Sequence, residues 1–144
     1  MAEASKSLVM NVAIGDLWKV ITDYAKYPEF VKGAEKVKVG ERKKGTLRVD
    51  YEIQMLGKDI AYSLEHIESE PGKMDWHLIE SNIFKNNTGA WNLKELGTKK
   101  TEATYTLSLE FKIFVPGMIL SGLVKSQLPE MLESFEKRTL KIFK

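Results

Sequence analysis

The amino-acid sequence predicts an α+β fold in which a seven-stranded antiparallel sheet packs one face against a single long C-terminal helix. Two patterns support this prediction. Residues 47–113 alternate apolar and polar side chains with a period of two, which is typical of antiparallel strands with one buried face. Residues 116–144 instead carry apolar side chains at helical spacing. A chain of 144 residues fits one core, so we expect a single domain over residues 1–144.

The first elements along the chain are predicted to be a strand and two helices. Residues 7–10 form the expected strand, and Asn11 is a suitable N-cap for the helix that follows. Four apolar residues then recur at helical spacing and would form the buried face of that helix: Ile14, Leu17, Trp18 and Ile21. Pro28 lies where a second, short helix would begin, and Gly33 lies where it would end.

Six further strands are expected between residues 34 and 113, because short turns interrupt the period-two pattern. The predicted turns are Lys44-Gly45, Leu56-Gly57-Lys58, Pro71-Gly72, Asn86 to Gly89, and Gly97-Thr98. Short turns connect neighbouring antiparallel strands, so these strands should form a meander. The last strand has the clearest buried face: Ala103, Tyr105, Leu107, Leu109, Phe111 and Ile113.

The C-terminal helix is expected to run from Pro116 to Lys144 and to cover the apolar face of the sheet. Its apolar side chains are Leu120, Val124, Leu128, Met131, Phe135 and Ile142. Pro129 removes one backbone hydrogen bond, so we expect a kink near Gln127-Leu128. One helix covers less area than a curved sheet presents, so a cavity can remain between them. The order strand, two helices, six strands and helix is that of the helix-grip fold.

Composition and charge exclude several classes of function. The chain has 22 basic and 20 acidic side chains, and this balance provides no broad basic surface for nucleic acid. It has no cysteine, which excludes disulfides, thiolate metal sites and a cysteine nucleophile. His66 and His77 should face opposite sides of the sheet, so we expect no metal site, and no cofactor-binding motif is present. Without a secretory signal or a membrane-spanning run, the expected location is the cytoplasm.

An unusually apolar connection joins the last strand to the C-terminal helix. Residues 113–120 contain no charge and no hydroxyl group, although connecting segments are normally polar. In a meander, this connection shares one end of the sheet with the turns near Leu56 and Phe84. We expect the rim formed by Leu56, Phe84 and Phe114 to Leu120 to surround a cavity mouth and to allow peripheral contact with a membrane. The alternative is that these side chains fold inward and plug the core.

The inward-facing residues of the strands and the helix are the candidate ligand-binding residues. They are Tyr51, Ile53, Tyr62, Leu64, Trp76, Leu78, Glu80, Trp91, Tyr105, Leu107, Leu109, Phe111, Met118, Leu120 and Val124. The tyrosine hydroxyls could donate to a ligand carbonyl or quinone oxygen. Glu80 in an apolar cavity would have a raised pKa and could act as a general acid or base. His66 also faces inward, but no acid–base pair is evident, so no catalytic residue is predicted.

The segment Asp23-Tyr24-Ala25-Lys26-Tyr27-Pro28-Glu29-Phe30-Val31 follows an amphipathic helix and resembles a known signature. It is similar to the Asp-x-x-x-Tyr-Pro-x-Phe motif of polyketide cyclase/dehydrase-like proteins in the START-like (SRPBCC, Bet v 1-like) superfamily. Further similar segments are residues 76–81, 89–93, 104–107 and 128–138. The nearest branches are the coenzyme Q-binding and ribosome-association-toxin proteins. The resemblance implies a helix-grip fold with a hydrophobic cavity, in which Tyr27, Pro28 and Phe30 close the wall.

Three functional hypotheses follow from these observations and from the resemblance, whose members bind lipids, quinones, sterols or polyketides. The first is a carrier that binds a hydrophobic small molecule, either a lipid or an isoprenoid quinone, without a cofactor. The second is an enzyme, a polyketide cyclase or dehydratase acting in the same cavity. It is less favoured, because no residue set here matches the catalytic constellation of a cyclase. The third is an interaction protein of the ribosome-association type.

Overall fold

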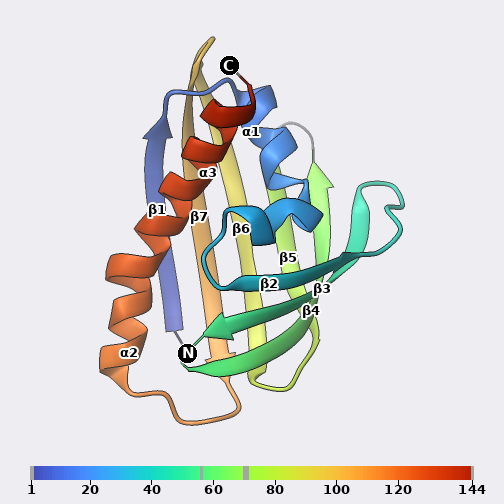
Figure 1. Ribbon diagram of the computed structural model, residues 1–144, viewed down its shortest axis with the longest axis vertical. Helices are drawn as coiled ribbons and strands as arrows, with labels where there is room; N and C mark the ends of the chain where they lie inside the picture. Colours follow the sequence, from blue (N-terminus) through green and yellow to red (C-terminus); the bar gives the residue numbers. More distant parts are fainter. Residues whose placement is uncertain (1, 56, 70–71, 144) are drawn as a thin grey trace.

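The computed structural model describes residues 2–55, 57–69 and 72–143. Its elements, in chain order, form a strand, two short helices, six strands and a C-terminal helix in three parts (Figure 1). They are β1 (Ala2–Met10), α1 (Ile14–Ile21), the 3-10 helix η1 (Tyr24–Glu29), β2 (Ala34–Val39), β3 (Thr46–Met55), β4 (Lys58–Ser69), β5 (Lys73–Ser81), β6 (Phe84–Gly97), β7 (Lys100–Phe111), α2 (Gly117–Gly122), the π-helix η2 (Leu123–Gln127) and α3 (Leu128–Ile142). The predicted element order is confirmed.

The seven strands form one sheet in the order β1-β7-β6-β5-β4-β3-β2, and every neighbouring pair is antiparallel. Strands β2 to β7 are a meander, as the short turns predict. Strand β1 joins the sheet beside the last strand, with Ala4 opposite Leu107 and Met10 opposite Thr101. The predicted seven-stranded antiparallel sheet of the helix-grip fold is therefore confirmed.

The C-terminal helix lies along the sheet on the same side as α1 (Figure 1). It contacts α1 and β1 through α3, whose buried side chains Leu132 and Phe135 belong to the same core cluster as Leu17 and Trp91. An ion pair between Arg138 and Glu29, 2.8 Å apart, also ties α3 to η1. These contacts hold α3 firmly, whereas no residue of α2 is buried.

The expected kink in the C-terminal helix is present as a five-residue π-helix, η2, between α2 and α3. Pro129 lies in the first turn of α3 and has no N–H group to donate to the carbonyl of Lys125. The wider turn of η2 lies directly before this proline, where the regular hydrogen-bond ladder is interrupted. Lys144, the predicted last residue of the helix, lies outside the described residues.

Three local predictions are wrong. Asn11 is not the cap of α1, because Ala13 holds that position and the Asn11 backbone N–H donates to Glu136 Oε2 at 2.8 Å. Pro28 lies inside η1, which begins four residues earlier at Tyr24. The segment Asn86 to Gly89 is not a turn, since β6 runs through it and the connection from β5 lies at residues 82–83.

Packing around Trp76 explains why residues 86–89 form a strand despite their turn-like composition. Asn87 faces the interior, where its Oδ1 accepts a hydrogen bond of 3.1 Å from Trp76 Nε1. Gly89 pairs with Trp76 across the β5–β6 ladder, and a Cβ atom at position 89 would overlap the indole ring and the Thr106 carbonyl oxygen. The asparagine is therefore a buried partner for the indole, and the glycine makes room for it.

We expect Gly89→Ala to destabilise the protein by about 1–3 kcal/mol, because the added methyl group forces Trp76 or the β6–β7 ladder to shift. Urea denaturation would measure this change. Gly15→Ala is the matched control, since Gly15 lies in α1 with no atom near its added Cβ. That variant should be as stable as the wild type or up to about 1 kcal/mol more stable. Equal stability of Gly89→Ala and the wild type would contradict the packing argument.

Candidate ligand-binding cavity

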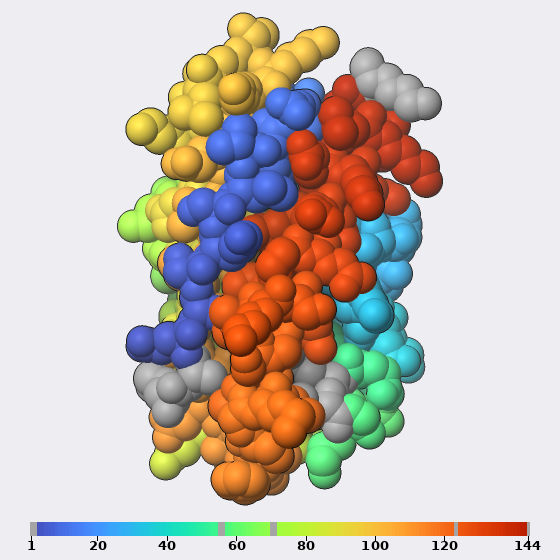
Figure 2. All heavy atoms as spheres, turned by 90° about the vertical axis from the view of Figure 1, so that its left-hand side faces the viewer, coloured from blue at the N-terminus to red at the C-terminus, as the bar shows by residue number. Residues whose placement is uncertain are grey.

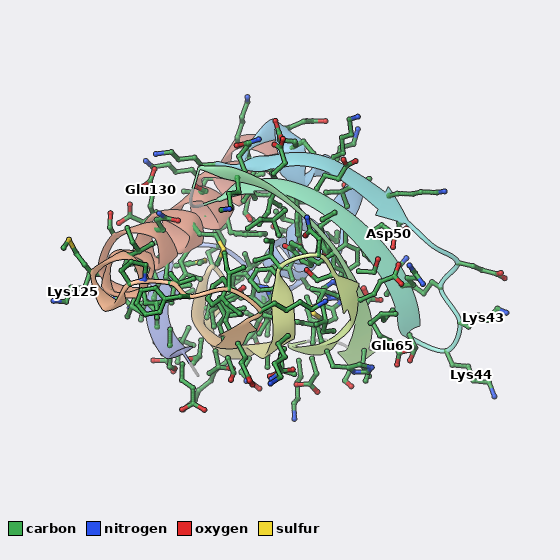
Figure 3. The ribbon with its side chains drawn as sticks, turned by 90° about the horizontal axis from the view of Figure 1, so that it is seen from below. Lys43, Lys44, Asp50, Glu65, Lys125 and Glu130 are labelled. Atoms are coloured by element: carbon green, nitrogen blue, oxygen red, sulfur yellow. The ribbon has the colours of Figure 1, made fainter. Side chains whose placement is uncertain are left out.

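A cavity of about 600 Å³ lies between the concave face of the sheet and the C-terminal helix. This volume is within the range of small-molecule binding sites. Figure 3 looks along the interior, with the helix that carries Lys125 and Glu130 on one side and the curved sheet around the other. The wall combines aliphatic and aromatic side chains, and its aromatic side chains are Tyr27, Tyr51, Tyr62, His66, Trp76, Phe84, Trp91, Tyr105 and Phe135.

Most of the candidate ligand-binding residues line this cavity. They are Tyr51, Ile53, Tyr62, Leu64, Trp76, Trp91, Tyr105, Leu107, Leu109, Leu120 and Val124. They come from β3 to β7 and from the α2–η2 part of the C-terminal helix, so the period-two and helical patterns identified the inner faces of both layers. Their role in binding a ligand stays a prediction.

Three apolar candidates lie outside the cavity wall. Leu78 and Phe111 pack into a small second core beside Phe84, which fills one end of the sheet. Met118 is 84% exposed and points away from the interior. Leu78 and Phe111 therefore lie where the second core closes one end of the cavity, and Met118 lies where α2 extends beyond the cavity wall.

Glu80 also lies outside the cavity, and its predicted inward orientation is wrong. The β4–β5 ladder pairs Ser63 with Glu80 but Leu64 with Leu78, so Ile79 is an extra residue in a β-bulge. The bulge reverses the alternation and turns Glu80 to the outer face. There its carboxylate lies 3.1 Å from Arg48 Nη2, and its side chain is 71% exposed.

Arg48 connects Glu80 to a polar cluster on the outer face of the sheet. Its Nε lies 2.9 Å from Asp50 Oδ1, and Ser63 Oγ donates to the same oxygen at 2.6 Å. These bonds, from Ser63 first and Arg48 second, hold the pKa of Asp50 below its usual value. Figure 3 shows Asp50 on the side of the sheet away from the helix. The cluster therefore stabilises the outer face and leaves the cavity without a carboxylate from β5.

His66 is a buried histidine of the cavity wall, and its imidazole is neutral. Its Nε2 lies 2.7 Å from the Tyr51 hydroxyl, and its Nδ1 lies 3.1 Å from Met74 Sδ. Sulfur only accepts, so we assign the proton to Nδ1, and Nε2 then accepts from Tyr51. Burial lowers the pKa of His66 to about 3. The imidazole is thus a hydrogen-bonded part of the wall at neutral pH.

A second polar chain lies behind His66. The ring of Tyr24 lies 4.5 Å from the imidazole ring, and the Tyr24 hydroxyl donates to Glu68 Oε2 at 2.7 Å. Arg42 Nε lies 2.7 Å from Glu68 Oε1, which neutralises this nearly buried carboxylate. The chain runs from the cavity wall to the surface, and the charge of Glu68 is paired with that of Arg42.

Several lining residues were missed by the sequence analysis. Met74 and Phe135 lie on faces that the patterns predicted to be buried, so the same patterns could have identified them as lining residues. Asn87 lies inside the wrongly predicted turn, and no sequence signal would have assigned it to the wall. Phe84 was predicted at the rim of the mouth, and it lies instead in the buried part of the wall.

The mouth of the cavity lies between the C-terminal helix, β1 and the end of β3. The exposed lining residues mark it: Glu3, Lys32, Gln54, Gly57, Val124, Gln127 and Glu130. Beside the mouth, we define the apolar rim as Ile113, Phe114, Met118, Ile119 and Val124, all of which are exposed. Phe114 is 87% exposed, and Figure 2 shows α2 at the lower end of the molecule, where the helix begins.

The rim differs from the predicted one in two places. Phe84 is 2% exposed and packs in the second core. At this position the alternative prediction is correct, namely that the apolar side chain folds inward and fills the core. Leu56 lies outside the described residues. No helix in the described part of the chain is long and apolar enough to cross a membrane. Within the same residues, no group of three His, Asp or Glu side chains could hold a metal ion.

We expect His66 to make the stability of the protein depend on pH. Its pKa is about 3 when folded and near 6.5 when unfolded, so only the unfolded chain binds the proton between these values. Stability from this group is complete above pH 6.5 and falls by about 1.4 kcal/mol per pH unit toward pH 3. His66→Gln removes this contribution, so the difference in unfolding free energy between wild type and variant should narrow as pH falls. Urea denaturation from pH 7 to pH 4 measures it.

His77→Gln is the matched control, because the His77 side chain is about half exposed on the outer face. This variant controls for the loss of an imidazole that does not line the cavity. A constant difference for His66→Gln over the same range would show that folding does not lower the pKa of His66.

The comparison with protein families gives one match, which covers most of the chain. The family described as "Polyketide cyclase / dehydrase and lipid transport" matches residues 10–136. No curated protein matches the chain. The match includes the Tyr-Pro-Glu-Phe segment, strands β2 to β7 and most of α3. The predicted nearness to the coenzyme Q-binding and ribosome-association-toxin branches stays a prediction.

Solved structures share the fold at low sequence identity. A START superfamily protein from Mycobacterium smegmatis has a TM-score of 0.85 at 17% identity, with 99% of each chain covered. The protein TTHA0849 from Thermus thermophilus has a TM-score of 0.84 at 19% identity, also with 99% of each chain covered. The Zhui aromatase/cyclase from Streptomyces sp. R1128 has a TM-score of 0.72 at 17% identity, covering 96% of this chain and 86% of that one. With its fold and its family match in agreement, this chain belongs to the polyketide cyclase/dehydrase and lipid transport family.

Proposed function

We propose that the protein binds and carries a hydrophobic small molecule, a lipid or an isoprenoid quinone, in the cavity between sheet and helix. The observation that supports this proposal is a cavity of about 600 Å³ whose charged lining residues, Glu3, Lys32 and Glu130, are all exposed at its mouth. The buried part of the wall is uncharged, and most of its side chains are aliphatic or aromatic. Such a wall favours ligands that lose little hydration when they enter.

Burial of apolar surface can supply enough free energy for this role. A ligand that buries about 300 Å² of apolar surface gains roughly 7 kcal/mol at about 25 cal/mol per Å². Loss of ligand freedom on binding offsets part of this gain. The aromatic rings limit the further loss, because they are held in place by packing on one another; Trp91, for example, lies 5.0 Å from both Tyr105 and Phe135.

The enzyme hypothesis has weaker support in the geometry. A cyclase or dehydratase needs a group that gives or takes a proton near neutral pH. Glu80 is on the outer face, His66 has a pKa of about 3, and burial raises the pKa of Tyr62 and Tyr105 well above the usual value. None of these groups suits acid–base chemistry at the cavity wall. The ribosome-association hypothesis rests on the resemblance alone.

The apolar rim supports peripheral contact with an anionic membrane as part of this function. Phe114 and Met118 are almost fully exposed next to Leu120 and Val124, which line the cavity. Residues 113–127 contain one charged side chain, Lys125, and it is positive. An apolar patch with a positive flank suits a lipid surface that carries negative charge. A ligand could then pass between bilayer and cavity with little exposure to water.

We expect Leu107→Trp to abolish ligand binding, because the indole would occupy the middle of the cavity. Protein purified from cells would be studied by native mass spectrometry, followed by solvent extraction and identification of the bound molecule. Leu96→Trp is the matched control, since Leu96 is exposed on β6, and it should carry the same ligand as the wild type. A wild type that carries nothing and takes up no added quinone or lipid would refute the proposal.

We expect Phe114→Ser to weaken binding to vesicles of phosphatidylcholine mixed with anionic phosphatidylglycerol by about tenfold or more, because it removes a large apolar side chain from the contact. Co-sedimentation with the vesicles gives the bound fraction. Leu140→Ser is the control, because Leu140 is 48% exposed at the other end of the C-terminal helix. If both variants bind vesicles as the wild type does, the rim is not a membrane contact.

A further inference from the structure

We propose that the cavity selects a neutral, oxygenated ligand whose carbonyl or quinone oxygen accepts hydrogen bonds from the hydroxyl groups of Tyr62 and Tyr105. This inference rests on the proposed function and narrows its ligand class. Pure hydrocarbons and anions such as carboxylates would be bound less well. Two features of the cavity support it: two hydroxyl groups are unpaired, and the charged side chains among its described lining residues are all exposed at the mouth.

The Tyr62 and Tyr105 hydroxyls have no hydrogen-bond partner among the residues that the structure describes. Both residues line the cavity, from β4 and β7. In the described part of the chain, every side-chain nitrogen or oxygen that is fully enclosed has a partner. These two oxygens are therefore not enclosed by protein atoms, and the space beside them is that of the cavity.

The other two tyrosines of the wall are already paired with the protein. The Tyr27 hydroxyl donates to the carbonyl oxygen of Ile21, and the Tyr51 hydroxyl donates to His66. An unpaired hydroxyl in an apolar site loses its hydrogen bond to water without replacement, and this costs free energy. A ligand oxygen placed next to Tyr62 or Tyr105 would supply the missing acceptor. A hydrocarbon of the same shape would not.

Packing holds both phenol rings in fixed positions. The Tyr62 ring stacks on Tyr51 with centroids 5.0 Å apart and meets the Phe84 ring at 5.3 Å. The Tyr105 ring lies 5.0 Å from Trp91 and 5.2 Å from Trp76. Rings held in this way present their hydroxyls at defined points, so little conformational freedom is lost when a ligand binds them.

The charge of the wall selects a neutral acceptor over an anion. Burial keeps both phenols protonated by raising their pKa, and His66 is also neutral. The positive side chain of the described wall, Lys32, is exposed at the mouth. A carboxylate inside the cavity would lose its hydration without gaining a counter-charge. A carbonyl oxygen has a much smaller hydration to lose.

Equilibrium dialysis with benzophenone and diphenylmethane tests the inference, because the two probes have nearly the same shape and only benzophenone has a carbonyl oxygen. We expect Tyr62→Phe and Tyr105→Phe each to weaken benzophenone binding about 2- to 10-fold, with the largest loss in the double variant. Diphenylmethane binding should be unchanged or tighter in all three variants. Diphenylacetate, an anion of similar size, should bind the wild type more weakly than benzophenone.

Tyr24→Phe is the matched control, because its hydroxyl donates to Glu68 and Tyr24 is not among the residues that line the cavity. It should lower the melting temperature but keep the preference for benzophenone over diphenylmethane. The inference is overturned if the double variant binds benzophenone as tightly as the wild type does. If the wild type binds neither probe, the proposed function and this inference both fail. If the wild type binds both probes and only the effect of the tyrosine substitutions is missing, this inference alone fails.

Discussion

A single helix has to cover the concave face of a seven-stranded sheet, and this mismatch in area determines the rest of the structure. Six strand spacings of about 4.8 Å make a sheet about 29 Å wide, whereas a helix with its side chains is only about 10 Å wide. The helices α1 and η1 cover part of the remaining face with Trp18 and Tyr24. The uncovered area is the cavity, and large aromatic rings such as those of Trp76 and Trp91 fill part of the gap.

The fold could be predicted from the sequence because both of its layers are amphipathic at a constant period. Leu107 and Tyr105 on β7 and Phe135 on α3 lie where their spacing places them. The prediction failed where the period breaks without a local signal. The bulge at Ile79 reversed the orientation of Glu80. No residue type in the segment 78–81 predicts that this strand has one residue more than its partner. The inward Asn87 likewise depends on a partner, Trp76, that is eleven positions away along the chain.

The position of that bulge also determines what chemistry the cavity can support. With regular pairing, Glu80 would continue the inward series of Trp76 and Leu78 and place a carboxylate against apolar walls. The extra residue instead brings the carboxylate to Arg48 on the outer face, next to Asp50 and Ser63. The interior keeps uncharged polar groups, namely phenols, an amide and a neutral imidazole. Such groups can recognise an oxygen atom, but they cannot move protons readily at neutral pH.

The break at Pro129 links the cavity to the apolar rim. After the break, α3 is anchored by four buried residues, which are Leu128, Leu132, Phe135 and Thr139. Before it, α2 has no buried residue, yet Leu120 and Val124 from this part still reach the cavity wall. A π-helical turn contains more residues than an α-helical turn, so it changes which side chains of the helix face inward. Met118, which lies before it, is exposed to solvent. The same short segment is therefore both a wall of the cavity and the base of the rim. In the proposed function, a surface that docks on the rim would lie beside the cavity mouth, and the position of one helix would affect both ligand entry and surface contact.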